Sequence, residues 1–288
     1  MTEDIIVPDL IPAADLSSTA LMTLINAAYA DYYLPVHIDQ TQLFEMRLQE
    51  DIDFTKSFVA FVNHQPIGVA LLSVRERQGW LSGVGVLPGF RRRGIARAVI
   101  RHIQNLVAEL GLQTLWLEML AQNDPGAALY QRLGFVKARD LLVLRAEAGQ
   151  YEPAAAPDHI RTVAPDQWLT HYQTFHDVRI PWQRSLRSLQ ARSHKLHSLG
   201  YWDGARLIGY ILYELYPDNH AIYDLAVDPA HPHRLDVAEA LLLALHTYRS
   251  DLGGYIINVP AEDPLAPAFT DLHYRVWQRQ HEMFWTIP

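Results

Sequence analysis

Apolar residues recur at helical spacing in three stretches of the first half of the chain. The longest stretch, residues 94–110, forms a single apolar stripe with a period of 3.6 residues. A second stretch begins after Ser17, a residue type that caps helices, and a third covers residues 41–50. These patterns predict three helices, and the proline at 125 predicts the first turn of a fourth.

Shorter apolar runs lie between these helices and are typical of β-strands. The runs cover residues 57–62, 67–74, 80–86, 114–120 and 141–145. The first two runs are joined by a short turn, which indicates a hairpin, whereas the third and fourth flank the longest helix, which indicates a crossover. This order predicts an α+β fold, in which helices flank a mixed, mostly antiparallel sheet.

The second half of the chain repeats the plan of the first. Gly68 matches Gly209, and Pro88 matches Pro229, at one offset of 141 positions. A constant offset across separate matches indicates a duplicated domain. An irregular stretch rich in Ala, Pro and Gly separates the halves and predicts a linker. The predicted boundaries are a first domain at 1–148, a linker at 149–157 and a second domain at 158–288.

Composition narrows the class of protein. The 288 residues are 49% hydrophobic and 19% charged, with a formal net charge of −8, values typical of a folded protein that binds nucleic acid and anionic membranes poorly. The absence of cysteine excludes disulfides and an acyl-cysteine intermediate. The start of the chain lacks the order of a signal peptide, and no apolar run is long enough to span a bilayer. We therefore expect a cytoplasmic protein.

Positive charge is concentrated where the predicted strand 80–86 leads into the longest helix. The first turn of a helix has unpaired N–H groups and a partial positive charge, which suit a diphosphate. Gly94 would let a phosphate approach the backbone closely. The arginines that precede or follow this glycine are Arg91, Arg92, Arg93, Arg97 and Arg101. The pattern predicts a polyanion site, although a solvated basic helix start would look the same.

The motifs of the first half resemble those of the GNAT superfamily of N-acetyltransferases. Arg91-x-x-Gly94-x-Ala96 is similar to the family's acyl-CoA motif, and Tyr130 and residues 133–135 match later elements. The resemblance covers most of the first domain. It implies a sheet that opens between its fourth and fifth strands, with acetyl-CoA as co-substrate. It also implies a set of cofactor-binding residues: Val84, Val86, Arg91, Arg92, Arg93, Gly94, Ile95, Ala96 and Asn123.

Two side chains suit the chemistry that this resemblance implies. An amine must lose a proton, the carbonyl oxygen needs donors, and the departing sulfur gains a proton. By the resemblance, Tyr130 supplies that proton and the backbone N–H of Val84 faces the oxyanion, although Tyr130 also fits a packed core. The strand 80–86 carries no carboxylate or histidine, so Glu118 is the candidate base unless it faces solvent or an arginine. Asn123 fits a cofactor contact or a helix cap equally well.

Three tyrosines fall where the family lines its acceptor site. Tyr29, Tyr32 and Tyr33 suit an alkylammonium group, although a helix core would also use them. We expect direct attack of a primary amine on acetyl-CoA in a ternary complex, without a covalent enzyme intermediate. The alternative is a non-catalytic acyl-CoA binding or sensing protein. The expected partners are a small-molecule amine or a peptide N-terminus, without nucleic acid, membrane or metal, and a homodimer is left open.

The second half lacks the features of the expected site. At the same offset, residues 91–96 correspond to residues 232–237, which contain no glycine. Pro232 removes a backbone donor and Asp236 would repel phosphate. Tyr130 corresponds to Asp271 by that offset. We therefore expect a degenerate second domain. The tandem plan also resembles thiol-cofactor biosynthetic acetyltransferases, although their active half is generally the second one.

Overall fold

The contacts of the computed structural model, which describes residues 5–34 and 36–287, divide the chain into two units. Unit 1 comprises Met1–Ala138 and His281–Pro288, and unit 2 comprises Arg139–Gln280. The chain start that argued against a signal peptide lies outside the described residues. Within the described ranges, no helix is both long enough and apolar enough to cross a membrane.

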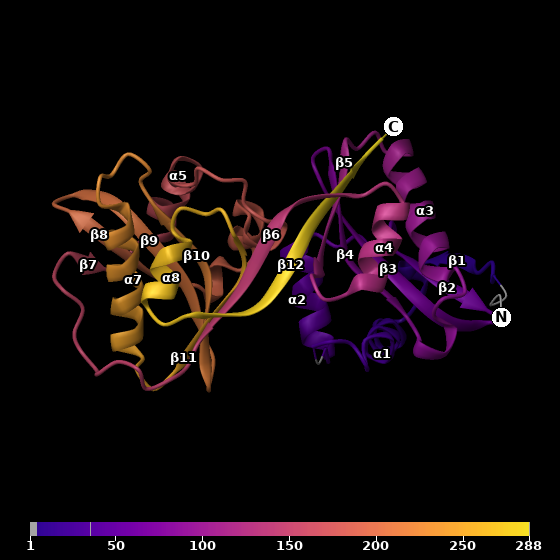
Figure 1. Ribbon diagram of the computed structural model, residues 1–288, viewed down its shortest axis with the longest axis horizontal. Coiled ribbons are helices and arrows are strands. Elements are labelled where there is room, and N and C mark those ends of the chain that lie inside the picture. The colour runs from indigo at the N-terminus through magenta and orange to yellow at the C-terminus, as the bar shows by residue number, and fades with distance from the viewer. Residues whose placement is uncertain (1–4, 35, 288) are drawn as a thin grey trace. The chain divides into compact units, whose positions relative to one another are not determined.

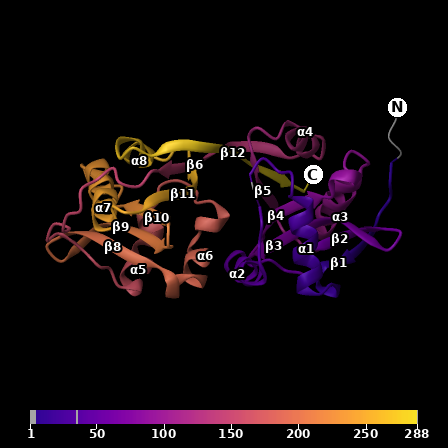
Figure 2. The same cartoon turned by 90° about the horizontal axis from the view of Figure 1, so that it is seen from below.

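Unit 1 is a mixed sheet with helices on both faces (Figures 1 and 2). The strand order begins β1-β2-β3-β4-β5. Those strands are β1 (Asp9–Pro12), β2 (Phe58–Val62), β3 (Gln65–Arg75), β4 (Gln78–Val86) and β5 (Thr114–Leu120). The helices are α1 (Ser18–Ala28), α2 (Gln40–Glu50), α3 (Ile95–Glu109) and α4 (Asp124–Arg132). The apolar stripe of α3 packs on one face of the sheet, and α1 and α2 pack on the other.

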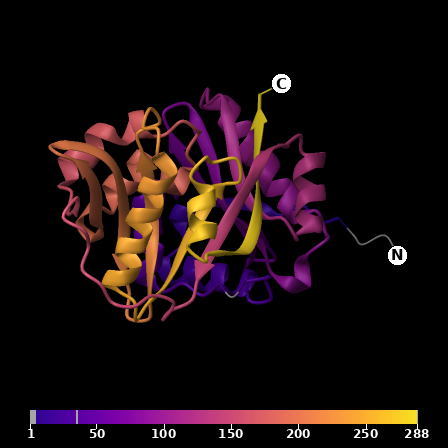
Figure 3. The ribbon, with the colours of Figure 1, turned by 60° about the vertical axis from the view of Figure 1, so that its left-hand side comes forward.

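Unit 2 repeats this arrangement with its own elements. Its strand order is β6-β11-β10-β9-β8-β7. The strands are β6 (Val136–Ala146), β7 (Ile160–Arg161), β8 (His197–Asp203), β9 (Arg206–Leu215), β10 (Asn219–Val227) and β11 (Gly253–Pro260). The helices are α5 (Pro165–Phe175), α6 (Leu186–Ala191), α7 (Arg234–Tyr248) and α8 (Ala266–Asp271). Helices α7 and α8, orange and yellow in Figure 3, share one core, whereas α5 and α6 pack in another.

Each unit contains one strand that comes, wholly or in part, from the other half of the sequence. Strand β6 begins in unit 1 and belongs to unit 2 from Arg139, and β12 (Arg275–Thr286) passes from unit 2 to unit 1 at His281. Met283 of β12 is buried against α3 in the core of unit 1. The domain boundaries expected at 148 and 158 describe the duplicated halves and remain a proposal, because the compact units exchange these strands.

Matching strand registers show that the two units share one plan. Strands β4 and β5 pair in parallel from Gln78↔Thr114 to Leu81↔Leu117, and β10 and β11 pair in parallel from Asn219↔Gly253 to Ile222↔Ile256. A β-bulge follows at Ser82 in unit 1 and at Tyr223 in unit 2. In both units the antiparallel pairing, of β3 with β4 and of β9 with β10, continues beyond the bulge. The expected α+β fold with two tandem domains is therefore confirmed.

Candidate active site

The central strands of unit 1 separate next to the bulge. Pairing of β4 with β5 ends at Leu81 and Leu117, although β4 continues to Val86 and β5 to Leu120. An extra residue in one strand bends that strand and increases its twist, which accounts for the separation after Ser82. The predicted cofactor residues Val84 and Val86 lie on the part of β4 that no longer pairs with β5 but still pairs with β3.

The end of α1 lies directly against β4 because two glycines make room for it. A Cβ atom on Gly85 would lie 2.9 Å from the Ala28 Cβ and 3.0 Å from the Tyr29 ring, and one on Gly83 would lie 3.4 Å from the Tyr29 hydroxyl. The Tyr29 hydroxyl donates to the Val84 carbonyl at 3.1 Å. The N–H and C=O of a strand residue project to the same side, so the Val84 N–H faces the side on which Tyr29 lies.

The predicted tyrosines meet across the separated strands. The Tyr29 and Tyr32 rings pack edge to face with centroids 5.2 Å apart, and Tyr33 packs on Tyr32 at 5.4 Å but is 49% exposed. The Asn123 side chain and the Leu120 backbone lie near the Tyr32 hydroxyl and oppose the rise that burial causes in its pKa. Tyr29 therefore contacts β4, whereas Tyr32 contacts the end of β5.

Tyr130 faces the same cluster from α4. Burial, followed by the nearby Tyr29 and Tyr32, raises the pKa of Tyr130 well above its ordinary value. Burial likewise raises the pKa of Tyr29 and of Tyr32. The three hydroxyls consequently stay protonated at neutral pH and can act as hydrogen-bond donors. The Tyr130 ring also packs on Phe135 with centroids 5.6 Å apart, so the core role considered from the sequence holds as well.

Asn123 caps α4 and contacts the cluster at the same time. Its Oδ1 accepts from the Gly126 N–H at 3.0 Å, while its side chain also lies near the Tyr32 hydroxyl. Gly126 lies so close that a Cβ atom there would be 2.7 Å from the Asn123 Nδ2. Asn123 is therefore a helix cap, one of the two roles considered from the sequence. The same side chain places the start of α4 near Tyr32.

The turn between β4 and α3 adopts a conformation that glycine favours. Gly94 is the N-cap of α3 with φ of 83°, in the left-handed region, and Ile95 and Ala96 form the first turn. A side chain on Gly94 would meet only Ile5 at 3.5 Å and the Arg97 guanidinium at 3.7 Å. The Arg93 guanidinium lies 6.0 Å from the Phe90 ring. This turn brings the N–H groups of the first helical turn next to the end of β4.

Arg91 has a different role from the free cationic donor expected from the sequence. Its guanidinium forms a bidentate pair with Asp31, at 2.8 Å and 2.6 Å, and also donates to the Ala28 and Val86 carbonyls at 3.0 Å each. The hydrogen bonds and charge of Arg91 lower the pKa of the Asp31 carboxyl. Arg91 therefore holds the end of α1 against β4, which leaves Arg92, at φ of 63°, and Arg93 as the neighbouring cations.

Glu118 lies on the opposite face of β5 from the α3 core. Leu117 and Met119 are buried in that core, and Glu118, which alternates with them, is half-buried on the other face. Trp116 shares this face and packs 5.1 Å from the Phe284 ring of β12. The carboxylate thus lies on the sheet face that α1 covers, as a base acting near the tyrosines would require.

Unit 2 replaces each of these groups. The backbone bond from Phe135 N–H to the Tyr130 carbonyl recurs from Tyr274 N–H to the Phe269 carbonyl, at 3.0 Å and 2.9 Å. Phe269 therefore occupies the place of Tyr130, and the correspondence to Asp271 expected from a constant offset was wrong, because the connection from β10 to α7 is two residues shorter than that from β4 to α3. The same alignment places Ile257 at the position of Glu118.

The helix start also differs in unit 2. A Cβ atom on Gly68 would meet Ile95 of α3 at 3.3 Å, and one on Gly209 would meet Val237 of α7 at 3.1 Å. Ile95 is the first residue of α3, whereas α7 already begins at Arg234, so it extends further toward β10. Asp236 lies in the first turn of α7.

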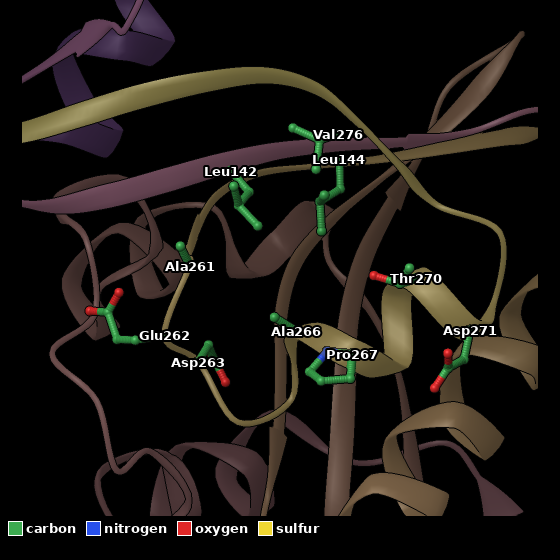
Figure 4. Close-up of a pocket in the computed structure, with 10 residues that line it drawn as sticks. All are labelled: Leu142, Leu144, Ala261, Glu262, Asp263, Ala266, Pro267, Thr270, Asp271 and Val276. Carbon is green, nitrogen blue, oxygen red and sulfur yellow. The ribbon is translucent and has the colours of Figure 1, made fainter.

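A pocket of about 450 Å³ lies in unit 2 beside α8 (Figure 4). Its lining includes Leu142 and Leu144 of β6 and the acidic residues Glu262, Asp263 and Asp271. Burial raises the pKa of the Asp263 carboxyl. Across the described part of the chain, no three His, Cys, Asp or Glu side chains are grouped so as to hold a metal ion.

Comparison with known proteins gives a family match for the first half. Residues 21–135 match the model of the Acetyltransferase (GNAT) family. The [Ribosomal protein bS18]-alanine N-acetyltransferase of Escherichia coli K12 is 34% identical over 76 residues, 26% of this chain and 51% of that protein. Mycothiol acetyltransferase of Geodermatophilus obscurus is 30% identical over 168 residues, 50% of this chain and 53% of that protein. The chain thus spans about half the length of the curated relatives it matches.

Solved structures resemble the whole chain in fold. A tandem GNAT protein from the clavulanic acid biosynthesis pathway aligns with a TM-score of 0.71, covering 96% of this chain and 98% of that one. The sequence identity is 16%, so the likeness concerns the fold alone. It includes both units, in agreement with their matching registers.

Proposed function

We propose that this chain, whose residues 21–135 match the model of the Acetyltransferase (GNAT) family, transfers an acetyl group from acetyl-CoA to a primary amine at a site in unit 1. The observation that carries the proposal is the convergence at the separated ends of β4 and β5. The helix start with Gly94 follows β4, the Tyr29 hydroxyl donates to the Val84 carbonyl, and Tyr130 lies near Tyr29 and Tyr32.

The proposed cofactor site uses backbone groups more than side chains. The N–H groups from Arg93 to Ala96 suit the pyrophosphate, because an anion is stabilised at a helix N-terminus. Val84 and Val86 present strand groups that can pair with the amides of the pantetheine arm. Arg91 contributes indirectly, since its bonds to Asp31 and Val86 fix the strand end on which the arm would lie.

The proposed chemistry is a direct displacement. The amine nitrogen bonds to the thioester carbon, and the carbonyl oxygen becomes an oxyanion that the Val84 N–H faces. As the oxyanion collapses to the amide carbonyl and the carbon–sulfur bond breaks, the sulfur takes a proton from Tyr130. The amine loses one proton in the same reaction, so the number of protons is conserved once Tyr130 is protonated again. The raised pKa of Tyr130 keeps this donor protonated. Glu118 is the proposed base, because it lies on the sheet face covered by α1.

The proposed acceptor is a small-molecule amine or a peptide N-terminus. The net charge of −8 does not repel a cationic acceptor, and the tyrosine rings suit an ammonium group. Among the relatives, one name specifies an alanine of ribosomal protein bS18 and another an aminoglycoside. Both are amine acceptors, which supports the class but does not select within it.

Calorimetric titration with acetyl-CoA tests the proposal. We expect the native chain to bind one equivalent, and the Gly94→Glu variant to lose binding because a carboxylate would face the pyrophosphate. Gly111→Glu is the matched control, since Gly111 lies at the other end of α3 with φ of 66° and nothing within 4 Å of an added Cβ. Equal binding by both variants would refute the cofactor site.

A panel of amines separates an enzyme from a sensor. Release of free CoA thiol on addition of an amine, with acetylated product, is the expected result. Tight binding of acetyl-CoA without turnover of any amine would favour the non-catalytic alternative, which the absence of a carboxylate or histidine on strand β4 also allows.

A further inference from the structure

The Arg184 side chain bridges the two central strands of unit 2 where their pairing ends. Its Nε donates to the Tyr223 carbonyl of β10, and its Nη1 donates to the Asn258 carbonyl of β11, both at 3.2 Å. The parallel pairing of these strands ends at Ile222 and Ile256. The guanidinium therefore lies between the strands, at the place where β4 and β5 separate in unit 1.

Asp224 holds this guanidinium inside the unit. The Arg184 Nη2 donates to Asp224 Oδ1 at 3.2 Å, and the Tyr210 hydroxyl donates to Asp224 Oδ2 at 3.0 Å. His176 Nε2 lies 3.1 Å from the same Oδ1. Arg184 is 2% exposed and Asp224 is fully buried. Burial would raise the pKa of Asp224, but His176, Arg184 and Tyr210 together lower it, so the pair stays charged.

The position of Arg184 in the chain corresponds to that of the unit 1 tyrosines. Arg184 ends the 3-10 helix η3 (Trp182–Arg184), in the connection from α5 to α6. The connection from α1 to α2 supplies Tyr29 and Tyr32, which contact β4 and β5 separately. The same connection thus reaches over the separated strands in both units, but in unit 2 one charged side chain bonds to both strands.

We propose that Arg184 is a permanent occupant of the strand opening in unit 2, in the place that the carrier arm of an acyl-CoA would need, so that exchangeable acyl-CoA binding is confined to unit 1. The identity of the unit 1 ligand rests on the proposed function, whereas the occupancy by Arg184 does not. Once its side chain is removed, the opening presents two carbonyls and a carboxylate, which suit a small guanidinium compound.

Thermal unfolding of an Arg184→Ala variant tests the occupancy. Removing one partner of a buried ion pair leaves an uncompensated charge, so we expect the unit 2 unfolding midpoint to fall by about 6–20 °C. Arg206→Ala is the matched control, because Arg206 also pairs with an aspartate, Asp228, but is 67% exposed. The midpoint of this control should change by no more than about 4 °C.

Chemical rescue distinguishes a fitted occupant from general damage. Ethylguanidinium at millimolar concentration should raise the midpoint of Arg184→Ala, whereas ethylammonium should not, because an ammonium lacks the planar fork that reaches several acceptors. If Arg184→Ala does not fold, Arg184→Lys should fold with an intermediate midpoint. Equal midpoints for Arg184→Ala and Arg206→Ala, or no response to ethylguanidinium, would overturn the proposal.

Acetyl-CoA stoichiometry provides the second readout. One equivalent bound by the native chain supports the proposal, and two equivalents overturn it. If the native chain binds none while Arg184→Ala is destabilised and rescued, the proposed function fails but the occupancy by Arg184 stands.

Discussion

Replacement of Gly85 by alanine should weaken unit 1 by pushing α1 away from β4. The new Cβ would lie 2.9 Å from the Ala28 Cβ and 3.0 Å from the Tyr29 ring. Carbon atoms in contact lie about 3.5–4.0 Å apart, so the helix end must move by roughly 0.6 Å or more. Overpacking of this kind costs about 1–3 kcal/mol. Because each kcal/mol of lost stability lowers the unfolding midpoint by about 2–4 °C in a unit of this size, the midpoint should fall by about 2–12 °C.

Differential scanning calorimetry of Gly85→Ala beside Gly89→Ala measures this effect. Gly89 has no heavy atom within 4 Å of an added Cβ, so its variant should unfold within about 0.5 kcal/mol of the native chain. Titration should also show weaker acetyl-CoA binding by Gly85→Ala, because the displaced Tyr29 shifts its bond to Val84. Unfolding midpoints within about 1 °C of each other, half of the smallest expected shift, would show that α1 does not press on β4.

Two further substitutions test the chemistry and the pH response. Tyr130→Phe should lower kcat by about 100-fold or more, the effect of losing a proton donor, while the affinity for acetyl-CoA persists. Steady-state rates of this variant and of the control Tyr33→Phe test the prediction. An unchanged kcat for Tyr130→Phe would exclude Tyr130 as the proton donor. Burial, His246 and Arg249 lower the pKa of His220 to about 3, whereas the unfolded value is about 6.5. The unfolded chain therefore binds more protons between these values, and stability should fall as pH falls through that window. Denaturant titrations should show a smaller pH slope for His220→Gln, and an identical slope would contradict the assignment.

Local sequence signals were sufficient for the elements that carry the proposed cofactor site. The strand, the turn with Gly94 and the apolar stripe of α3 all lie within about thirty consecutive residues, and each has a local physical cause: turn geometry, helix capping and hydrophobic period. Tyr130 and Asn123 could be placed for the same reason, since Asn123 caps one short helix and Tyr130 lies in the last turn of that helix.

Interactions between distant segments were not predictable in the same way. Arg91 looked like a phosphate ligand, because nothing in the sequence indicates that Asp31, sixty positions earlier, would pair with it. The role of Gly85 depends on the approach of α1, and Arg184 reaches its partners only after β10 and β11 have separated. The misplaced counterpart of Tyr130 has a simpler cause, since a constant offset cannot follow a change in loop length.

The exchange of β6 and β12 sets an order for biosynthesis. Unit 1 needs Met283 and its neighbours, yet the rest of that unit ends at Ala138. At about 5–20 residues per second, a ribosome takes roughly 7–30 s to translate the intervening segment. During that time the nascent first half lacks its last strand and exposes part of its core. The site that begins with Tyr29 would therefore be completed only when the last strand has left the ribosome.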